Sequence, residues 1–298
     1  MDKPEWLTIK PASTEKYSII KSRIKELGLH TVCVEAHCPN MSECWSSGTA
    51  TFMVLGDVCT RGCHFCAVSK NQNGINIDQL EPVKLAQLVK EWKLGYIVVT
   101  SVCRDDLEDK GASHFAKCIQ AIKKENKETI VEVLIPDFDG DIGALKKITD
   151  AKPDVIGHNI ETVSRLSPKA RDRRATYEQS LTVLKNVKTL DKSIYTKSAM
   201  MLGIGETEEE IIKAMADLRD AGVDFLAMGQ YLRPVSTGFF IEVKEYVTPQ
   251  MFEHLKNIAE NMGFLYVASG PFVRSSYKAG EFFIKSKIEA RNLSIKVP

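Results

Sequence analysis

Short apolar runs alternate with amphipathic segments over most of the chain. The apolar runs are rich in Val, Ile and aromatic residues, a composition typical of buried strands. They predict strands at residues 51–58, 96–101, 129–135, 154–159, 194–202, 223–231 and 264–270. In the segments between them, apolar residues recur at helical spacing. These segments predict helices at residues 81–94, 113–124, 142–149, 177–187, 207–221 and 248–262.

Strands that alternate with helices predict parallel β/α units. At least six such units follow one another, and no Gly-rich phosphate-binding loop follows the first strand. We therefore predict an α/β fold, a partial (β/α)6 TIM-like barrel, rather than a Rossmann sheet. The functional residues of a barrel lie at the carboxyl ends of its strands. Polar residues occupy these positions at Thr100–Ser101, His158–Asn159 and Gly229–Tyr231.

The first 50 residues do not share this alternation and read as an N-terminal arm. Apolar residues at helical spacing predict a helix at 17–27, which Gly28 ends. Cys33, Cys38 and Cys44 follow in a predicted loop that contains Pro39 and Asn40. The predicted organisation is an N-terminal extension at 1–50, a barrel at 51–270 and a C-terminal extension at 271–298.

Composition and charge exclude several classes of protein. The 298 residues are 44% hydrophobic, enough to form one large domain or two smaller ones. Lys and Arg total 40 against 39 Asp and Glu, so nothing indicates binding to nucleic acid or to a membrane surface. No apolar run approaches the roughly 18 residues of a membrane span. The first residues, MDKPEWLTIKP, lack the pattern of a signal or transit peptide.

Six of the eight cysteines form two triplets within 34 residues of sequence, from Cys33 to Cys66. The first triplet is spaced C-x4-C-x5-C and the second C-x3-C-x2-C. Their positions are Cys33, Cys38 and Cys44, then Cys59, Cys63 and Cys66. Free thiols at this density indicate a reducing compartment. We therefore expect a cytoplasmic protein, or an organellar one that has lost its targeting segment.

Two groups of three fit metal clusters better than disulfides, which need even numbers. A structural zinc site has four protein ligands, usually in two close pairs, and neither triplet supplies them. A cubane iron–sulfur cluster also has four corners. Three cysteines leave one iron for a ligand other than cysteine. A structural zinc site remains the alternative.

The second triplet, CTRGCHFC at 59–66, resembles the signature of radical S-adenosylmethionine (SAM) enzymes, with Phe65 as its aromatic residue. The upstream CVEAHCPNMSEC and the late RSSY at 274–277 narrow the resemblance to the lipoyl synthase family. Further family motifs are TSVCRDD, HNIETV, RDRRATYEQSL, MLGIGET and GQYLRP. Together they cover roughly residues 5 to 285. The resemblance implies a barrel of the radical SAM type, whose extensions carry an auxiliary cluster.

The resemblance also implies the reaction. Lipoyl synthases insert two sulfur atoms at carbons six and eight of an octanoyl chain attached to a carrier-protein lysine. A 5′-deoxyadenosyl radical formed from SAM removes hydrogen from these unactivated carbons, so no residue is expected to act as an acid or base. The resemblance assigns a SAM-binding 4Fe–4S cluster to the second triplet. It assigns a sulfur-donating auxiliary 4Fe–4S cluster to the first triplet, with Ser276 as fourth ligand and Ser275 as the alternative.

Other residues receive roles by the same resemblance. Phe65, Asn159 and Glu161 are expected to bind the cofactor, and His158 is expected to be structural. Arg173 and Arg174 could hold a carboxylate or a cluster sulfide, or lie on a solvated face. Gln230 and Arg233 lie at another strand end, and their roles are left open in the same way.

The resemblance implies several partners. The substrates are octanoylated lipoyl-carrier proteins, namely the lipoyl domains of 2-oxoacid dehydrogenases and the glycine cleavage H protein. An electron donor such as ferredoxin or flavodoxin and an iron–sulfur carrier for cluster rebuilding are also expected. Two alternatives remain: another sulfur-inserting radical SAM enzyme such as a biotin synthase, and an electron carrier or zinc-structured binding module.

One position departs from the family pattern. The family commonly has Asp where this chain has Cys103, and a cysteine cannot reproduce the charge of a carboxylate. We predict that Cys103, like Cys118 on an apolar helix face, is a small buried apolar side chain and not a metal ligand.

Overall fold

The computed structural model describes residues 3–8, 15–46, 50–235 and 238–276, together with residues 286 and 288. Tyr277 of the RSSY motif and most of the predicted C-terminal extension at 271–298 lie outside the described residues. The division into extensions and barrel stays a prediction.

A single large sheet forms the centre of the molecule. Its strand order is β1-β2-β5-β6-β7-β8-β9-β10, and every neighbouring pair except β1–β2 is parallel. The parallel strands are β2 (Thr51–Val54), β5 (Tyr96–Ser101), β6 (Ile130–Leu134), β7 (Val155–Gly157), β8 (Tyr195–Leu202), β9 (Phe225–Gln230) and β10 (Tyr266–Gly270). Within the described part of the chain β1 and β10 do not pair, so the barrel is open between its two edge strands.

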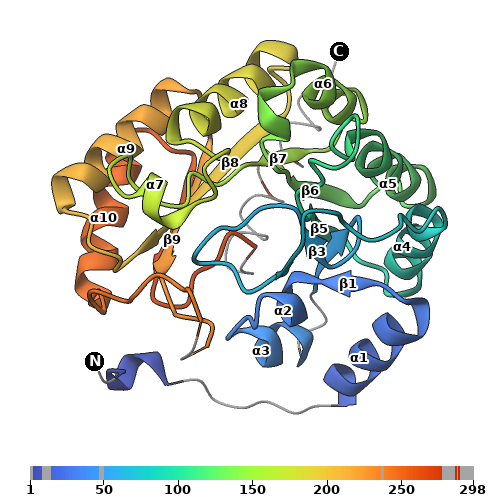
Figure 1. The fold of residues 1–298 in the computed structure, drawn as a ribbon, viewed down its shortest axis with the longest axis horizontal. Coiled ribbons are helices and arrows are strands. Elements are labelled where there is room, and N and C mark those ends of the chain that lie inside the picture. The colour runs from blue at the N-terminus through green and yellow to red at the C-terminus, as the bar shows by residue number, and fades with distance from the viewer. Residues whose placement is uncertain are drawn as a thin grey trace.

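Helices cover the outside of this sheet (Figure 1). They are α4 (Glu81–Glu91), α5 (Ala112–Glu125), α6 (Ile142–Asp150), α8 (Tyr177–Leu190), α9 (Glu208–Asp220) and α10 (Pro249–Asn261). A short helix, α7 (Ser167–Ala170), precedes α8. The predicted α/β partial barrel is therefore confirmed, with six β/α units and a seventh parallel strand, and the predicted helices differ from the observed ones by a few residues at their ends.

The first parallel strand is shorter than predicted. It ends at Val54 because Leu55 and Gly56 adopt left-handed conformations, with φ of 71° and 90°. Left-handed residues turn the chain away from the strand. Cys59 lies in a separate short strand, β3 (Val58–Cys59), which pairs with β4 (Ser69–Lys70).

The sheet is buried on both faces, as expected for parallel strands between a helical layer and a barrel interior. All four residues of β2 and all six of β9 are buried. One apolar cluster centres on Phe115, Leu88 and Val99, and a second on Met215, Leu226 and Phe252. The two clusters lie under the two halves of the helical layer.

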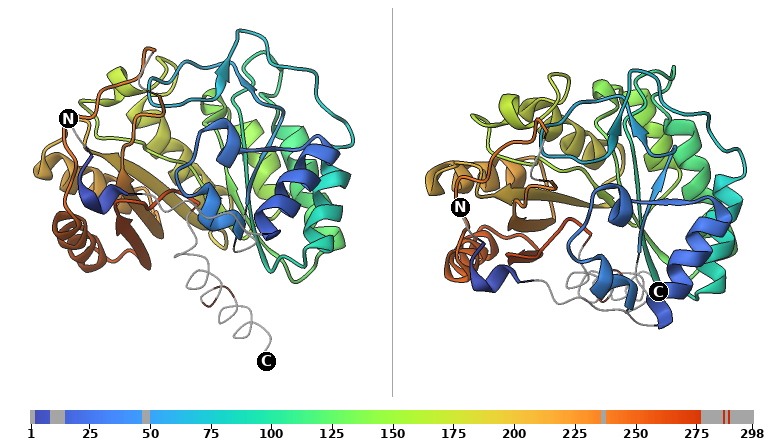
Figure 2. Two further views of the ribbon diagram at one scale, coloured as in Figure 1. Left: turned by 90° about the horizontal axis from the view of Figure 1, so that it is seen from below. Right: turned by 60° about the horizontal axis from the view of Figure 1, so that its bottom comes forward.

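The N-terminal segment lies across the open side of the barrel (Figures 1 and 2). It contains α1 (Glu15–Leu27), β1 (His30–Thr31), α2 (Val32–Glu35) and α3 (Met41–Ser46), after a 3-10 turn at Glu5–Leu7. β1 pairs antiparallel with β2, and an ion pair of 2.9 Å between Arg23 and Glu91 joins α1 to α4. The predicted helix at 17–27 is confirmed.

The predicted loop for the first cysteine triplet is wrong in part. Cys33 lies on α2 and Cys44 on α3, and only Cys38 lies between helices. The side chain of Thr31 caps α2 by accepting a hydrogen bond from Val34 N, which explains why so short a helix forms. Trp45 on α3 is 1% exposed and anchors this segment to the core.

The N-terminal segment meets the segment after β10 at the barrel opening. The buried side chain of Asn40 donates a hydrogen bond from Nδ2 to the backbone oxygen of Phe272, at 2.7 Å. The segment after β10 therefore lies against the first triplet. Among the described residues, no helix combines the length and the apolar character that crossing a membrane would require.

We predict that Gly229→Ala destabilises the protein and displaces residues 271–276. A Cβ at Gly229 would lie 1.9 Å from Val273 O, a backbone atom that cannot move aside locally. Overpacking of this kind costs about 1–3 kcal/mol. The free energy of unfolding is measured by urea denaturation. Gly270→Ala is the matched control, because Gly270 pairs with Gly229 in the sheet and its Cβ would meet only a side-chain atom of Val273, at 3.6 Å. Equal losses in the two variants would contradict the prediction.

Candidate active site

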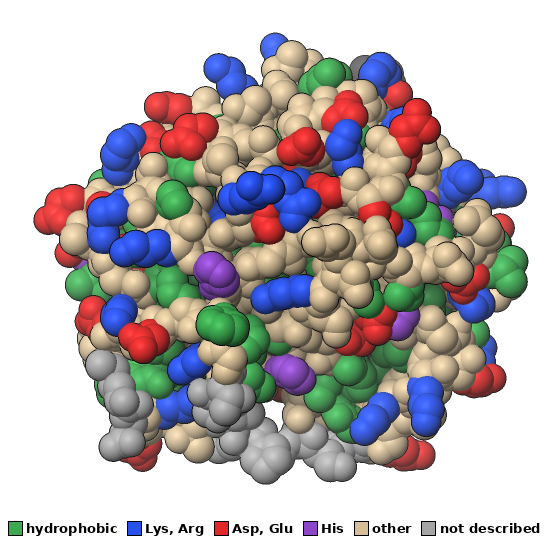
Figure 3. Space-filling view, viewed as in Figure 1, with side chains coloured by type: hydrophobic (Ala, Val, Ile, Leu, Met, Phe, Trp, Pro, Cys, Tyr) green, Lys and Arg blue, Asp and Glu red, His purple; other side chains and the backbone are tan. Residues whose placement is uncertain are grey.

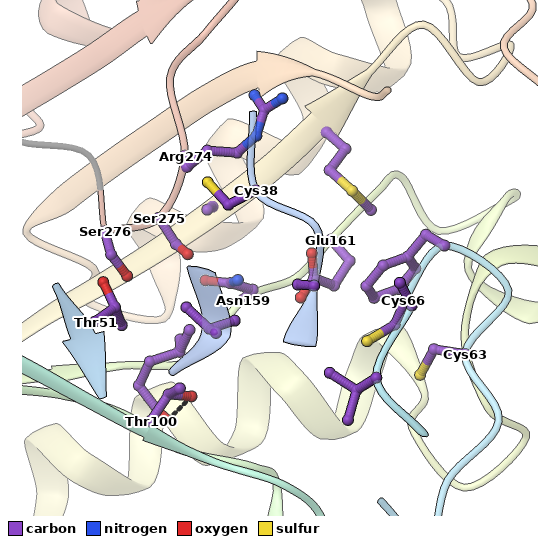
Figure 4. A pocket seen from close by; sticks show the side chains of 18 of the residues that line it. Cys38, Thr51, Cys63, Cys66, Thr100, Asn159, Glu161, Arg274, Ser275 and Ser276 are labelled. Atoms are coloured by element: carbon purple, nitrogen blue, oxygen red, sulfur yellow. Dashed lines mark hydrogen bonds between the residues drawn. The ribbon is translucent and has the colours of Figure 1, made fainter. Parts of the chain in front are cut away.

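A cavity of about 520 Å³ opens at the carboxyl ends of the parallel strands. All six cysteines of the two triplets line it, as do Phe65, Asn159, Glu161, Ser275 and Ser276. In Figure 4, Cys38 and the two serines lie on one side, Cys63 and Cys66 on the other, and Asn159 and Glu161 between them. Side chains that are up to 243 residues apart in sequence, from Cys33 to Ser276, therefore share one cavity.

The backbone around the first triplet is held by local hydrogen bonds. Cys38 N donates to Cys33 O at 3.0 Å, and Cys44 N donates to Asn40 O at 2.9 Å. These bonds wind the segment so that its three thiols face the cavity. The Asn40–Phe272 contact brings the segment carrying Ser275 and Ser276 to the same side. The structure thus places a hydroxyl pair beside a set of three thiols.

Cys59 ends β3, Cys63 and Cys66 lie on the loop between β3 and β4, and the segment at 169–174 holds this loop. His64 N donates to Ala170 O at 2.8 Å, and Gly62 N donates to an oxygen of Asp172 at 2.8 Å. The Cys63 sulfur accepts a hydrogen bond from Asp172 N at 3.3 Å. The pKa of Asp172 lies well below its usual range, chiefly because Arg174 donates hydrogen bonds to it. Asp172 therefore stays an acceptor for the loop at all ordinary pH values.

A buried arginine links this loop to the ends of two other strands. The Arg61 side chain is 3% exposed and forms ion pairs of 2.8 Å with Asp105 and 2.7 Å with Asp137. Burial alone would raise the pKa values of both carboxyls, but the hydrogen bonds from Arg61 lower them. A buried charge is tolerated only when it is paired in this way.

Burial keeps most of the thiols protonated in the absence of metal. It raises the pKa of Cys66 to about 12 and also raises the pKa values of Cys33, Cys38 and Cys63. Cys59 differs, because a hydrogen bond with the Cys103 side chain lowers its pKa to about 6. A metal that binds these sulfurs must therefore displace protons.

The spacing of the sulfurs disfavours a single zinc ion. Sulfurs that bind one zinc at about 2.3 Å lie less than 4.8 Å apart. Within the described ranges, two groups of three potential ligands meet within 4.8 Å, Glu81/His114/Cys118 and His30/Glu35/Asp57, and neither contains a triplet cysteine. A cluster in which each thiolate binds a different iron fits the wider spacing.

Asn159 and Glu161 follow β7 and face the centre of the cavity (Figure 4). Glu161 has a left-handed backbone, with φ of 67°, which its bridge to Met200 of β8 maintains. A strained non-glycine residue at a cavity often has a functional role. Burial raises the pKa of Glu161 above its usual range, although the positive charge of Arg171 and the amide of Asn159 partly oppose this shift. The pair offers a carboxyl and an amide to a polar ligand.

His158 is buried and hydrogen-bonded at both ring nitrogens, in agreement with its predicted structural role. Nδ1 lies 2.9 Å from Ile135 O, and Nε2 lies 2.9 Å from Ser180 Oγ. Because a carbonyl can only accept, Nδ1 carries the proton and Nε2 is the acceptor. Arg171 donates to the same Ser180 hydroxyl at 2.7 Å. Burial lowers the pKa of His158 to about 4.

The remaining predicted residues have different surroundings. Arg173 is exposed, whereas Arg174 forms ion pairs with Asp172 and Asp105 and so belongs to the loop network. Gln230 is buried and its amide contacts the backbone of Leu202, Glu245 and Val247. Arg233 Nη2 donates to Gly238 O at 3.1 Å, and Arg233 also lines the cavity.

Cys118 is buried as predicted, whereas the predicted burial of Cys103 is wrong, and that neither residue binds metal stays a prediction. Cys118 is 0% exposed in the core under α4 and α5. Cys103 is half-buried and lines the cavity, so it is not a core residue. The physical reason is that Cys103 follows the carboxyl end of β5, where side chains point into the barrel mouth.

Sequence reasoning missed the residues that fix the turn after β2. The Leu55 N–H donates to a Glu81 oxygen at 3.0 Å, and Arg104 donates to Leu55 O at 3.2 Å. His114 lies 2.7 Å from the same Glu81 oxygen. Asp105 and Asp172, also missed, lie within the quoted motifs TSVCRDD and RDRRATYEQSL. The isolated Asp137 and Glu81 gave no comparable signal.

The face that contains the cavity carries mixed charge. Figure 3 shows Lys, Arg and His side chains towards its centre and many Asp and Glu side chains towards its rim. Lys70 is exposed and donates to Cys63 O at 2.9 Å, while its amine lies 5.5 Å from the Phe240 ring. Phe239, which precedes Phe240 in the sequence, is 96% exposed.

Comparison with known proteins identifies related chains. Residues 53–226 match the model of the radical SAM superfamily. The chain is 52% identical to the lipoyl synthase of Myxococcus xanthus over 98% of this chain and 97% of that protein. It is 53% identical to the lipoyl synthase of Halobacterium salinarum, over 95% and 91% of the two chains. It is 50% identical to the apicoplast lipoyl synthase of Plasmodium vivax over 97% of its residues, but spans only 65% of that relative's length.

Similar solved structures support the fold alone. Methylornithine synthase has a TM-score of 0.52 and 13% identity, with 81% of each chain covered. Streptococcus suis SuiB bound to S-adenosylmethionine has a TM-score of 0.57 and 10% identity, over 78% of this chain and 55% of that one.

We predict that acid destabilises the protein through His158. Its folded pKa of about 4 lies below the ordinary value of 6.5. The unfolded chain therefore binds the proton first, and stability is lost as pH falls from about 6.5 to about 4. This lowering of the His158 pKa corresponds to a loss of about 3 kcal/mol in the free energy of unfolding. Urea denaturation at pH 7 and pH 5 measures it. The pH dependence should be smaller in His158→Gln, and an unchanged slope in that variant would contradict the assignment.

Proposed function

This chain belongs to the lipoyl synthase family of the radical SAM superfamily, and from that premise we propose that it converts a protein-bound octanoyl-lysine into lipoyl-lysine. The reaction inserts two sulfur atoms, at carbons six and eight of the octanoyl chain. The observation that carries the proposal is the single cavity lined by both cysteine triplets and Ser276. An enzyme that must bring a radical source and a sulfur source to one alkyl chain needs both at one site.

The residues present fit two iron–sulfur clusters and SAM. Membership of the superfamily implies one 4Fe–4S cluster and SAM. We assign this cluster to Cys59, Cys63 and Cys66, and a second 4Fe–4S cluster to the first triplet with Ser276. When bound, these groups supply the electron that cleaves SAM and the sulfur that enters the product. Thiolates are the usual ligands of such clusters, and each triplet leaves one position for another ligand.

The chain's own residues bind SAM and hold the loops of the cavity in place. We propose that Asn159 and Glu161 hold polar groups of SAM, because an amide and a carboxyl face the cavity between the triplets. Phe65 provides an apolar wall beside them. The barrel and the N-terminal segment enclose the cavity and so exclude water and stray reductants. His158, Arg171 and Asp172 position the loops and take no part in proton transfer.

The partners follow from this proposal. The substrates are octanoylated lipoyl domains of 2-oxoacid dehydrogenases and the glycine cleavage H protein. A ferredoxin or flavodoxin supplies electrons, and an iron–sulfur carrier rebuilds the consumed cluster. A reducing compartment is required, either the cytosol or an organelle matrix.

The test compares three proteins after anaerobic reconstitution. Wild type should bind about eight irons and eight sulfides, as two 4Fe–4S clusters require. With SAM, a strong reductant and an octanoyl-lysine peptide, mass spectrometry should detect the lipoyl peptide. Cys63→Ala should cleave no SAM, because the electron donor is lost. Cys38→Ala should cleave SAM without forming thiolated product. About four irons in wild type, or lipoyl product from Cys38→Ala, would overturn the assignment.

Serine at a cluster corner has a specific consequence. A serine alkoxide is harder than a thiolate and matches an iron–sulfur cluster less well. We predict that Ser276→Cys retains the auxiliary cluster but slows sulfur insertion, whereas Ser276→Ala loses or loosens one iron. Iron content and single-turnover product yield are the measurements, with Ser275→Ala as the matched control. A severe loss confined to Ser275→Ala would move the ligand one residue back.

A further inference from the structure

Phe239 is the most exposed large apolar side chain that the structure describes, and the function described so far gives it no role. Its side chain is 96% exposed, whereas the next, Leu80, is 61% exposed. We propose that Phe239 and two cations beside it dock the carrier protein at the opening of the cavity, through a carrier surface that offers an apolar contact flanked by acidic groups. The inference rests on the proposed function in that the octanoyl chain arrives attached to a protein.

Both sequence neighbours of Phe239 contact side chains that line the cavity. Arg233 Nη2 donates to Gly238 O at 3.1 Å, and the amine of Lys70 lies 5.5 Å from the Phe240 ring. Arg233 and Lys70 are part of the cavity wall, and Phe239 is not. Its exposed ring therefore stands outside the cavity, next to the opening.

Hydrogen bonds fix the backbone that follows Phe239. Ile241 N donates to His64 O at 2.9 Å, and the Tyr231 hydroxyl donates to Ile241 O at 2.9 Å. His64 belongs to the loop of the second triplet, and Tyr231 lines the cavity. The segment that carries the exposed ring is therefore joined to the candidate active site at two points.

The attachment of the substrate to a protein identifies the occupant of this surface. An octanoyl chain on a lysine reaches the cavity only when the carrier surface around that lysine lies against the opening. Residues just outside the opening then contact the carrier, whereas a small free substrate would enter without touching Phe239. An aromatic side chain that becomes buried in such an interface often supplies a large share of the binding free energy.

The two cations beside Phe239 indicate the charge of the carrier surface. Lys70 and Arg233 donate hydrogen bonds to backbone oxygens, and within the described ranges of the chain neither forms an ion pair. The nearby carboxylate of Glu242 pairs with Lys244 instead, at 2.8 Å. Two unmatched positive charges next to an exposed phenyl ring favour a partner with carboxylates around its apolar contact.

The experiment presents the same octanoyl-lysine in two forms. One is a short peptide, which is too small to cover the surface outside the opening. The other is a folded carrier, either the octanoylated lipoyl domain or the octanoylated H protein, whichever wild type converts faster. Single-turnover rates of reconstituted full-length protein, with SAM and a strong reductant, give the half-saturating concentration of each substrate. Calorimetric titration without SAM gives the Kd of the carrier independently of the reaction.

Three variants are compared with wild type, and thermal unfolding is measured for each. Phe239→Ser removes the ring, and Phe239→Leu retains an apolar side chain. Leu265→Ser is the matched control, because Leu265 is 46% exposed and precedes β10. It therefore lies at the amino ends of the strands, on the side of the barrel opposite the cavity.

We expect Phe239→Ser to raise the Kd and the half-saturating concentration of the carrier about tenfold, which corresponds to about 1.4 kcal/mol of binding free energy. Phe239→Leu should give a smaller increase, and Leu265→Ser should match wild type. Conversion of the peptide should be the same in all these proteins. Added salt should raise the Kd of the carrier, because it screens exposed charges.

Several outcomes overturn the inference. An unchanged carrier Kd in Phe239→Ser, or an equal increase in Leu265→Ser, would show that the ring is not in the interface. An equal loss with the peptide would show that Phe239 acts on the cavity and not on docking. A carrier Kd that does not respond to salt would overturn the acidic character of the partner.

Two further measurements separate the remaining cases. If sedimentation velocity shows a wild-type dimer that Phe239→Ser dissociates, a second copy of this chain covers the ring and the inference is wrong. If wild type converts neither the peptide nor the carrier, the proposed function fails instead. The carrier Kd in wild type and Phe239→Ser still decides the docking inference in that case.

Discussion

The buried guanidinium of Arg61 is the constraint on which the candidate site depends. A cation at 3% exposure must be paired, and its partners Asp105 and Asp137 come from the ends of β5 and β6. Because Arg61 lies between Cys59 and Cys63, these pairs draw the cysteine loop onto the barrel mouth. Asp172 and Arg174 hold the same loop from the far side. The loop can therefore present its thiols in one arrangement before any metal binds.

The open barrel makes the other half of the site possible. A closed barrel would leave no gap for the N-terminal segment, which here supplies the edge strand β1 and contributes three cysteines. The Asn40–Phe272 hydrogen bond joins the N-terminal segment to the segment after β10 at that gap. Gly229 lets the backbone at Val273 approach β9 more closely than any side chain would allow. The first triplet and its hydroxyl partners therefore exist as a set only in the folded chain.

Metal binding and folding are coupled at this site. Most of the thiols are buried, and burial keeps them protonated. Cluster formation must therefore release their protons. Cys59 is the exception, since its neighbour Cys103 lowers its pKa.

The sequence by itself determined the order of strands and helices, because local hydrophobic periodicity and helix-terminal residues are properties of neighbouring positions. It also determined which residues could bind metal, since the cysteine spacings are local patterns. It did not determine that β1 joins the sheet, that β2 ends at Val54, or that Cys103 lines the cavity. These depend on contacts between residues far apart in the chain, such as Glu81 with the Leu55 amide. Only the tertiary structure decided them, because parallel strands bring distant carboxyl ends to one edge and local sequence does not encode which side chains meet there.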